Sequence, residues 1–132
     1  LTSINNLGSL LHAKGDLDAA EPLFHEALGM QRATLGNRHP HTLRSINNLG
    51  HLLQAKGDLD AAEPLFREAL GVLRATLGNR HPDTLTSINN LGSLLQDKGN
   101  LDAAEPLYRE ALGVTRATLG NRHPDTLCSI NN

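Results

Sequence analysis

The chain has 132 residues, of which 39% are hydrophobic and 20% are charged, and its formal net charge is -2. This length and composition suit one soluble unit with a buried core. Acidic and basic side chains nearly balance, so no long-range field attracts nucleic acid or an anionic membrane, and no segment approaches the roughly 18 apolar residues of a membrane span. We therefore expect a partner that is neither nucleic acid nor a membrane.

Cysteine usage points to the compartment and argues against catalysis. Cys128 is the only cysteine, so no intrachain disulfide can form, and we expect a cytoplasmic protein. Cys128 has no second cysteine or neighbouring base that would make it a redox pair or a nucleophile. The sequence therefore predicts no enzyme and no cofactor. The chain begins in mid-pattern, so we interpret it as an excerpt of a longer protein.

An internal repeat of 42 residues organises the whole chain. LTSINNLG at Leu1 returns as LRSINNLG at Leu43, LTSINNLG at Leu85 and LCSINN at Leu127. A fixed period of this length is typical of repeat architectures. We predict a single array, 1–132, with full units at 1–42, 43–84 and 85–126 and a partial fourth unit at 127–132.

The first predicted element of each unit is an amphipathic helix. In the first unit, Ile4, Leu7 and Leu11 have the spacing that places them on one stripe of a helix. Lys14-Gly15-Asp16 ends it, because glycine readily adopts the left-handed conformation that follows a helix.

A second helix follows directly. Asp18 and Glu21 are spaced as a capping box at its start, and Pro22 is near enough to that start to cost little. Gly36 is the expected stop, and Pro40 fits the first turn of the helix that opens the next unit. The apolar stripe of this second helix is Leu17, Ala20, Phe24, Ala27, Leu28 and Leu35. Each unit is thus predicted to be an antiparallel helix pair, and only stacking on neighbouring pairs completes its core.

These positions resemble the pattern of the tetratricopeptide repeats. The matching residues are Leu7, Gly8, Leu11, Ala20, Phe24 and Ala27; Leu49, Gly50, Leu53, Ala62, Phe66 and Ala69; and Leu91, Gly92, Leu95, Ala104, Tyr108 and Ala111. The resemblance implies an all-α fold, a right-handed superhelical solenoid of antiparallel helix pairs, with small residues where helices cross closely. The extended repeat, with its AEPL, EAL and LG..HP segments, is similar to that of kinesin light chains. That likeness implies a scaffold or adaptor that binds proteins, but not attachment to a motor, because no heptad coiled coil is present.

Comparison of the units with one another indicates a candidate binding face. The positions that vary on the first helix of each unit lie within an arc of about 100 degrees, opposite the apolar stripe. These residues are Thr2, Arg44, Thr86 and Cys128; Ser9, His51 and Ser93; His12, Gln54 and Gln96; and Ala13, Ala55 and Asp97. Two asparagines in the same arc do not vary.

An asparagine offers both a donor and an acceptor, so it can hold the backbone of an extended peptide whatever its sequence, while varying neighbours select side chains. In tetratricopeptide repeats the first helix lines the concave groove, and the family grips peptides with an asparagine at the positions of Asn6, Asn48 and Asn90. We predict that a protein or extended peptide binds to Asn6, Asn48, Asn90, Asn5, Asn47, Asn89, Arg44, His51, Gln54, Ser93, Gln96 and Asp97. The alternative is that the asparagines bond across adjacent helices, or that near-identical copies record recent duplication.

The preferred ligand is less clearly indicated. Arg44 and His51 are two helical turns apart and could meet an acidic or C-terminal group, although Asp97 opposes them and a solvated pair is the simpler interpretation. Seven histidines raise the question of a metal. His39, His81 and His123 recur once per unit, however, and should be too far apart to converge on zinc, so we predict no metal site.

Two other functions remain open. The second alternative is that the array is a structural spacer or associates with itself. The cut ends of a solenoid expose apolar stacking surfaces, and these allow end-to-end contact. The third alternative is an RNA-binding helical repeat, which needs basic or aromatic side chains that Ser9, Gln54, Gln96 and Asp97 do not supply.

Overall fold

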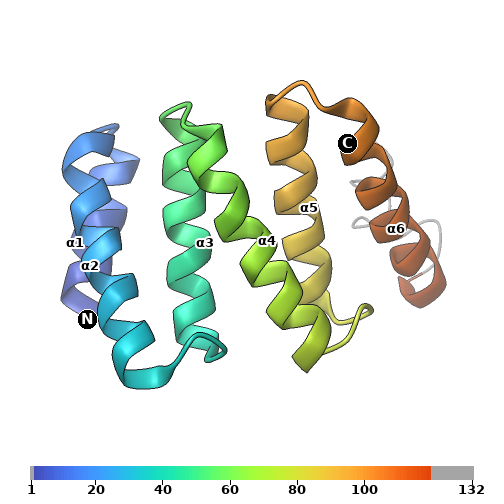
Figure 1. The fold of residues 1–132 in the computed structure, drawn as a ribbon, viewed down its shortest axis with the longest axis horizontal. Helices are drawn as coiled ribbons and strands as arrows, with labels where there is room; N and C mark the ends of the chain where they lie inside the picture. Colours follow the sequence, from blue (N-terminus) through green and yellow to red (C-terminus); the bar gives the residue numbers. More distant parts are fainter. Residues whose placement is uncertain (1, 120–132) are drawn as a thin grey trace. The chain divides into compact units, whose positions relative to one another are not determined.

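The computed structural model describes residues 2–119 and contains, within them, helices and no strand. The helices are α1 (Thr2–Ala13), α2 (Leu17–Leu35), α3 (Pro40–Ala55), α4 (Leu59–Thr76), α5 (Pro82–Asp97) and α6 (Leu101–Leu119). This confirms the predicted all-α class (Figure 1). The predicted partial unit at 127–132, with Cys128, lies outside the described residues, and so does His123.

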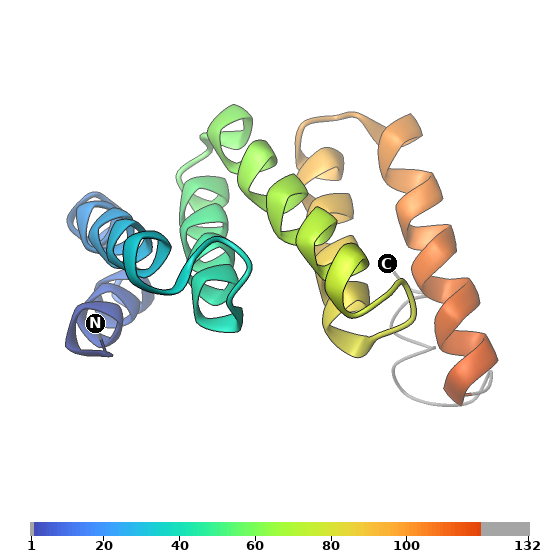
Figure 2. The ribbon, with the colours of Figure 1, turned by 60° about the horizontal axis from the view of Figure 1, so that its bottom comes forward.

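The chain divides into two compact units, 1–69 and 70–132, and α4 runs through the boundary. In the first unit α1 and α2 are antiparallel neighbours and α3 packs against α2 (Figures 1 and 2). In the second unit α5 and α6 form the same kind of antiparallel pair. Consecutive helices therefore associate as helix pairs within each unit.

The starts of α3 and α5 confirm the prediction for Pro40 and add a role for histidine. Each of these helices has proline in its first turn and a histidine as its N-cap residue. The His39 Nδ1 accepts a hydrogen bond from the His41 backbone N–H at 3.1 Å, and His81 accepts from the N–H of Asp83 at the same distance. These imidazoles thus satisfy backbone donors that a helix start leaves free.

The glycine stops are also confirmed. Gly15, after α1, has φ of +87°, and Gly36, after α2, has φ of +84°. The Gly36 N–H donates to the carbonyl of Arg32. Only glycine takes this left-handed conformation without steric cost, so the two breaks are determined locally.

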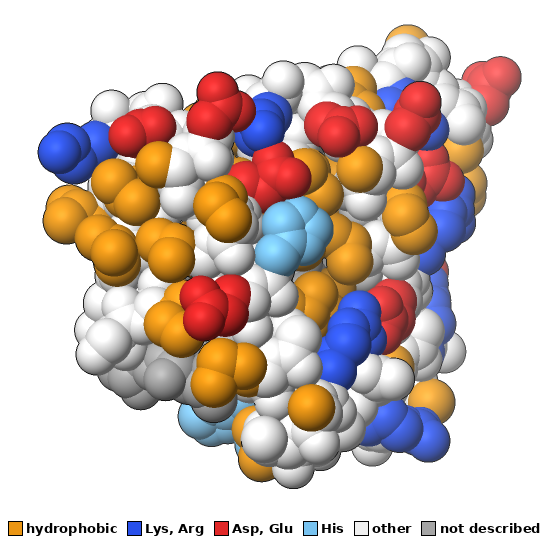
Figure 3. All heavy atoms as spheres, turned by 60° about the vertical axis from the view of Figure 1, so that its left-hand side comes forward, with side chains coloured by type: hydrophobic (Ala, Val, Ile, Leu, Met, Phe, Trp, Pro, Cys, Tyr) orange, Lys and Arg blue, Asp and Glu red, His pale blue; other side chains and the backbone are white. Residues whose placement is uncertain are grey.

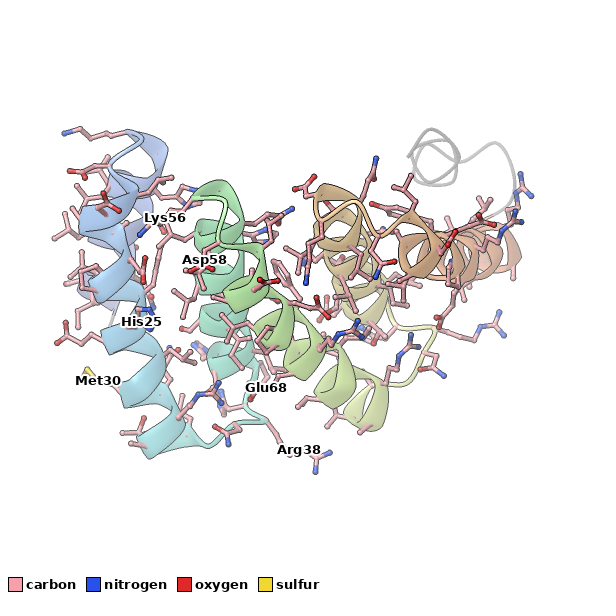
Figure 4. The ribbon with its side chains drawn as sticks, turned by 45° about the horizontal axis from the view of Figure 1, so that its top comes forward. His25, Met30, Arg38, Lys56, Asp58 and Glu68 are labelled. Atoms are coloured by element: carbon pink, nitrogen blue, oxygen red, sulfur yellow. The ribbon has the colours of Figure 1, made fainter. Side chains whose placement is uncertain are left out.

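The predicted capping box of α2 is wrong. The helix starts at Leu17 with Asp16 as its N-cap, and no side chain caps it. Asp18 and Glu21 instead bind the Nζ of Lys56 at 2.9 and 2.5 Å. Lys56 directly follows α3 (Figure 4). The ammonium of Lys56 attracts both carboxylates more strongly than a neutral backbone N–H does, and its hydrogen bond is the main cause of the lowered pKa of Glu21.

The close crossing of the two helices in a pair is confirmed. Phe24 and Phe66 are almost completely buried, and so are Ala20 and Ala62. A Cβ placed on Gly50 would lie 2.9 Å from the Cε1 and Cζ atoms of Phe66. The aromatic ring therefore occupies the space that the missing side chain leaves.

Two members of the predicted apolar stripes are exposed. Leu35, in the last turn of α2, is 43% exposed. Leu7 is 48% exposed, although Leu49 at the same position of α3 is 1% exposed, because α2 packs on α3 and no described helix packs on the outer side of α1. Leu10 is exposed for the same reason, and hydrophobic side chains gather on this end of the first unit (Figure 3).

Candidate functional site: a hollow between α1 and α3

The predicted groove residues lie on α1, α3 and α5, with different degrees of exposure. The exposed ones are Asn6, Arg44, His51, Gln96 and Asp97, and the half-buried ones are Asn5, Asn47, Asn48, Gln54, Asn89, Asn90 and Ser93. The helix pattern alone thus placed them on surfaces that a partner can reach, but it did not rank them.

One hollow, in the first unit, brings part of this set together. It has a volume of about 340 Å³ and is lined by Ser9, His12 and Ala13 of α1, Phe24 of α2, and Asn48 and His51 of α3. Asn48 and His51 belong to the predicted groove, whereas Asn6 and Arg44 do not line the hollow. Arg44 and His51 both lie on α3, but of the two only His51 lines the hollow.

Aromatic contacts orient both histidine rings. His12 meets the ring of Phe24 edge-on, with centroids 6.5 Å apart, and His51 meets Phe66 in the same way at 5.1 Å. Phe24 is 2% exposed and packs over Gly8, so the floor of the hollow is fixed by the helix crossing. The two imidazoles are thus held on a rigid base.

The electrostatics of the hollow disfavour a positive charge while it is empty. The His51 residue is exposed overall, yet its ring lies against the wall of the hollow, and this burial is the main cause of its lowered pKa. The charge of His12 lowers the pKa of His51 further. No carboxylate is among the residues that line the hollow.

The asparagine pairs contain unused acceptors. The Oδ1 atoms of Asn5 and Asn47 are buried and have no hydrogen-bond partner. A buried acceptor without a donor is costly.

The family model of the tetratricopeptide repeat matches residues 1–75, 45–117 and 83–132. The chain belongs to the tetratricopeptide repeat family. None of the curated proteins matches it.

Solved structures identify the subclass of these tetratricopeptide repeats. A kinesin light chain candidate from Podosopora anserina with nearly identical TPR-like repeats has a TM-score of 0.88 and 28% identity over 98% of this chain, and a single-substitution variant of the same protein has 0.88 and 26%. BtubC (BKLC) from P. vanneervenii has a TM-score of 0.80 and 26% identity over 98% of this chain. The repeats are therefore similar to those of kinesin light chains. The chain spans 61% of the length of the first two proteins and 51% of the third.

Sequence reasoning missed the contribution of α1 to the hollow of the tetratricopeptide array. Ser9, His12 and Ala13 are at positions that vary between the 42-residue repeats. The sequence of a single repeat does not show which residues of the next repeat they face. His12, at position 12 of the first 42-residue repeat, lines the same hollow as His51, which is at position 9 of the second repeat. A comparison of neighbouring units with an offset of one helical turn would have paired them.

Neither a cluster of metal ligands nor a membrane-spanning helix occurs among residues 2–119 of the array. Residues 2–119 contain no group of three or more histidine, cysteine, aspartate or glutamate side chains that could hold a metal ion. No helix among them is both long and apolar enough to cross a lipid bilayer.

Proposed function

We propose that this tetratricopeptide array is a protein-interaction module that binds an extended segment of a partner protein on the first helix of its repeats. These helices are α1 and α3 in the first compact unit and α5 in the second. The main support is the preformed hollow of about 340 Å³ that Asn48 lines. A second observation is the side-chain oxygen of the preceding residue, Asn47, which is buried and has no hydrogen-bond partner. Members of the family commonly mediate protein interactions, and the proposal requires no reaction and no cofactor. The single cysteine favours the cytoplasm as the site of this interaction.

The two asparagines of α3 have separate roles in this proposal. The Asn47 Oδ1 accepts a backbone N–H of the bound segment, which satisfies an acceptor that is otherwise buried without a partner. Asn48 lines the hollow and donates to a group that enters it. The varying side chains around them would then select the sequence that binds.

A peptide-library screen on the purified array tests the proposal. Asn47→Ala and Asn48→Ala should each lose most of the binding while the far-ultraviolet circular dichroism stays unchanged and the unfolding midpoint does not fall. For Asn47 the midpoint should even rise, because the substitution removes an unsatisfied acceptor. His25→Ala, on the exposed surface of α2, is the matched control and should bind normally. Lost stability with intact affinity would show that the asparagines are structural and would overturn the proposal.

A second role, end-to-end self-association, is favoured by the surface of α1. Leu7 and Leu10 are exposed where Leu49 and Leu52, at the same positions of α3, are buried. A second copy of this chain presents on α6 the same type of helix that covers α3 inside the array. We propose that such contact produces a spacer or an extended array.

A further inference from the structure

The histidine pair occurs once in the sequence, where the first 42-residue repeat is followed by the second. His12 and His51 occupy two of the varying positions, and the corresponding residues at the next junction are Gln54 and Ser93. The pair of imidazoles that lines this hollow is therefore not repeated at the corresponding positions of the sequence.

The lining of this hollow has an apolar floor and a polar rim. Phe24 and Ala13 supply carbon surface, while Asn48 and the two imidazoles supply polar atoms. The side-chain nitrogen of an asparagine donates hydrogen bonds, and a protonated imidazole donates from both ring nitrogens. The rim can thus surround a group that accepts several hydrogen bonds at once.

The charges around the hollow favour an anion over a cation. His12 and His51 are the only titratable side chains among the lining residues. The acids of α2, which are Asp18, Glu21 and Glu26, are not among the lining residues. Asp18 and Glu21 are also bound to Lys56. Nothing in the lining can neutralise a bound cation, whereas a bound anion directly stabilises an imidazole that gains a proton.

We propose that the hollow takes an anionic side chain of the bound segment, a carboxylate on an apolar stem, and that binding takes up a proton from solvent on the His12 and His51 pair. The stem lies on Phe24 and the carboxylate accepts from Asn48 and the protonated imidazole. This inference rests on the proposed peptide-binding function and specifies the class of ligand and its regulation.

The proposal predicts that affinity depends on pH in one direction. Burial and the charge of His12 lower the pKa of His51 in the empty hollow, so the ring is neutral near pH 7. A bound carboxylate raises that pKa, because it stabilises the protonated form. By linkage, affinity increases as the pH falls, by at most about tenfold per pH unit for one proton.

The test uses two small probes of the same shape, hydrocinnamate and hydrocinnamamide, with NMR of the histidine ring signals as the readout. We expect hydrocinnamate to bind about tenfold more tightly at about pH 5.5 than at about pH 7.5, whereas the uncharged amide should bind equally at both. The double variant His12→Gln, His51→Ser carries the residues found at Gln54 and Ser93, so its fold should be kept. It should bind acid and amide alike.

The possible outcomes separate this inference from the function on which it rests. Equal affinity of the acid and the amide at both pH values, failure of both to perturb the rings, or an acid preference that survives in the double variant would each overturn the inference. The library screen gives an independent result, because peptide binding that depends on Asn47 can persist when the histidines are replaced. Loss of binding in the Asn47 variant tests the function, and loss of acid preference alone tests the inference.

Discussion

At the scale of single residues, the glycines of this chain divide into two kinds. Gly8, Gly50 and Gly92 each lie beneath an aromatic ring, at distances that leave no space for a methyl group without movement of the ring. Gly29, in the middle of α2, is exposed, and no atom lies within 4 Å of the position that a Cβ would take there. Only the first kind is required by packing.

The substitutions Gly50→Ala and Gly29→Ala should therefore have opposite effects. The Cβ of the first would lie 2.9 Å from Phe66, and this overpacking should reduce the free energy of unfolding by about 1–3 kcal/mol. The second should increase it by up to about 1 kcal/mol, because alanine favours a helix interior. Urea denaturation measures both, and equal midpoints would contradict the assigned crossing.

Buried hydroxyl groups show a second contrast between the repeats. Ser45 donates to the Oε1 of Gln31, and both side chains are buried. One repeat later, 42 residues along the chain, Leu73 is at the position of Gln31 and Ser87 is at that of Ser45. The Ser87 Oγ is buried with no hydrogen-bond partner. One repeat thus keeps a satisfied polar pair where the other has only half of it.

We expect Ser45→Ala to lower the free energy of unfolding by about 1–2 kcal/mol, because it leaves the amide oxygen of Gln31 buried without a donor. Ser87→Ala should be neutral or stabilising, since it removes an unsatisfied hydroxyl. Thermal denaturation of the two variants side by side gives the comparison. A larger loss for Ser87→Ala would show that its hydroxyl has an unrecognised role.

At the scale of the helices, bidentate ion pairs connect the second helix of one pair to that of the next. The Arg32 Nη1 and Nη2 atoms donate to the two carboxylate oxygens of Glu68 at 2.7 and 2.8 Å, and Arg32 also donates to Asn37 in the connector. Arg74 and Glu110 repeat this geometry at 2.7 and 2.8 Å. About a third of each side chain is exposed, so solvent weakens these pairs.

The ion pairs predict a pH dependence of stability. The hydrogen bond from Arg32 is the main cause of the lowered pKa of Glu68, and burial opposes it. Because the folded pKa lies below the unfolded value, the stabilisation is complete above about pH 4.5 and is lost as the pH falls through the folded pKa. Glu68→Gln should cost about 1 kcal/mol near pH 7 and should make the unfolding midpoint less sensitive to pH between about 5 and 3.

The pair of Glu105 and Arg109 provides the control for that measurement. These side chains lie four residues apart on α6 and are 62% and 76% exposed, with a distance of 2.8 Å between them. Such a pair contributes little, so Glu105→Gln should leave the midpoint and its pH dependence nearly unchanged. An equal response of both variants would show that the bidentate geometry adds nothing.

At the scale of the whole molecule, the same ion-pair pattern predicts how copies associate. Glu26 on α2 stands at the position of Glu68, and Arg116 on α6 stands at that of Arg32, but neither has a partner among residues 2–119. A second copy that stacks on the exposed face of α1 can pair its Arg116 with Glu26 of the first. Arg116 of one copy and Glu26 of the other would then form the same bidentate ion pair that Arg32 and Glu68 form inside the array.

We expect the average mass in light scattering to increase with protein concentration. Glu26→Arg should weaken that increase, because it places two cations opposite each other, and the double variant with Arg116→Glu should restore it. Leu10→Glu should also weaken association, since it puts a charge on the apolar face of α1. A concentration-independent mass would exclude self-association under these conditions and leave the groove as the proposed interaction surface.

The sequence by itself determined the local structure. The helix breaks at Gly15 and Gly36, the proline start of α3 and the crossing of a glycine under an aromatic ring all follow from the steric demands of single residues. The sequence contains each of these features once per repeat. The asparagines and varying residues of α1, α3 and α5 were likewise assigned to one helix face by the helical period. The predicted unit boundaries at 42 and 84 remain a prediction.

Only the tertiary structure decided which side chains meet across helices. Asp18 and Glu21 bind Lys56 from another helix pair instead of capping α2, Leu7 lacks the cover that Leu49 has, and His12 faces His51 across a junction. These contacts depend on the stagger and separation of neighbouring pairs. The physical reason is that helical periodicity fixes the direction of a side chain around its own axis, whereas its partner depends on how a second helix packs against the first.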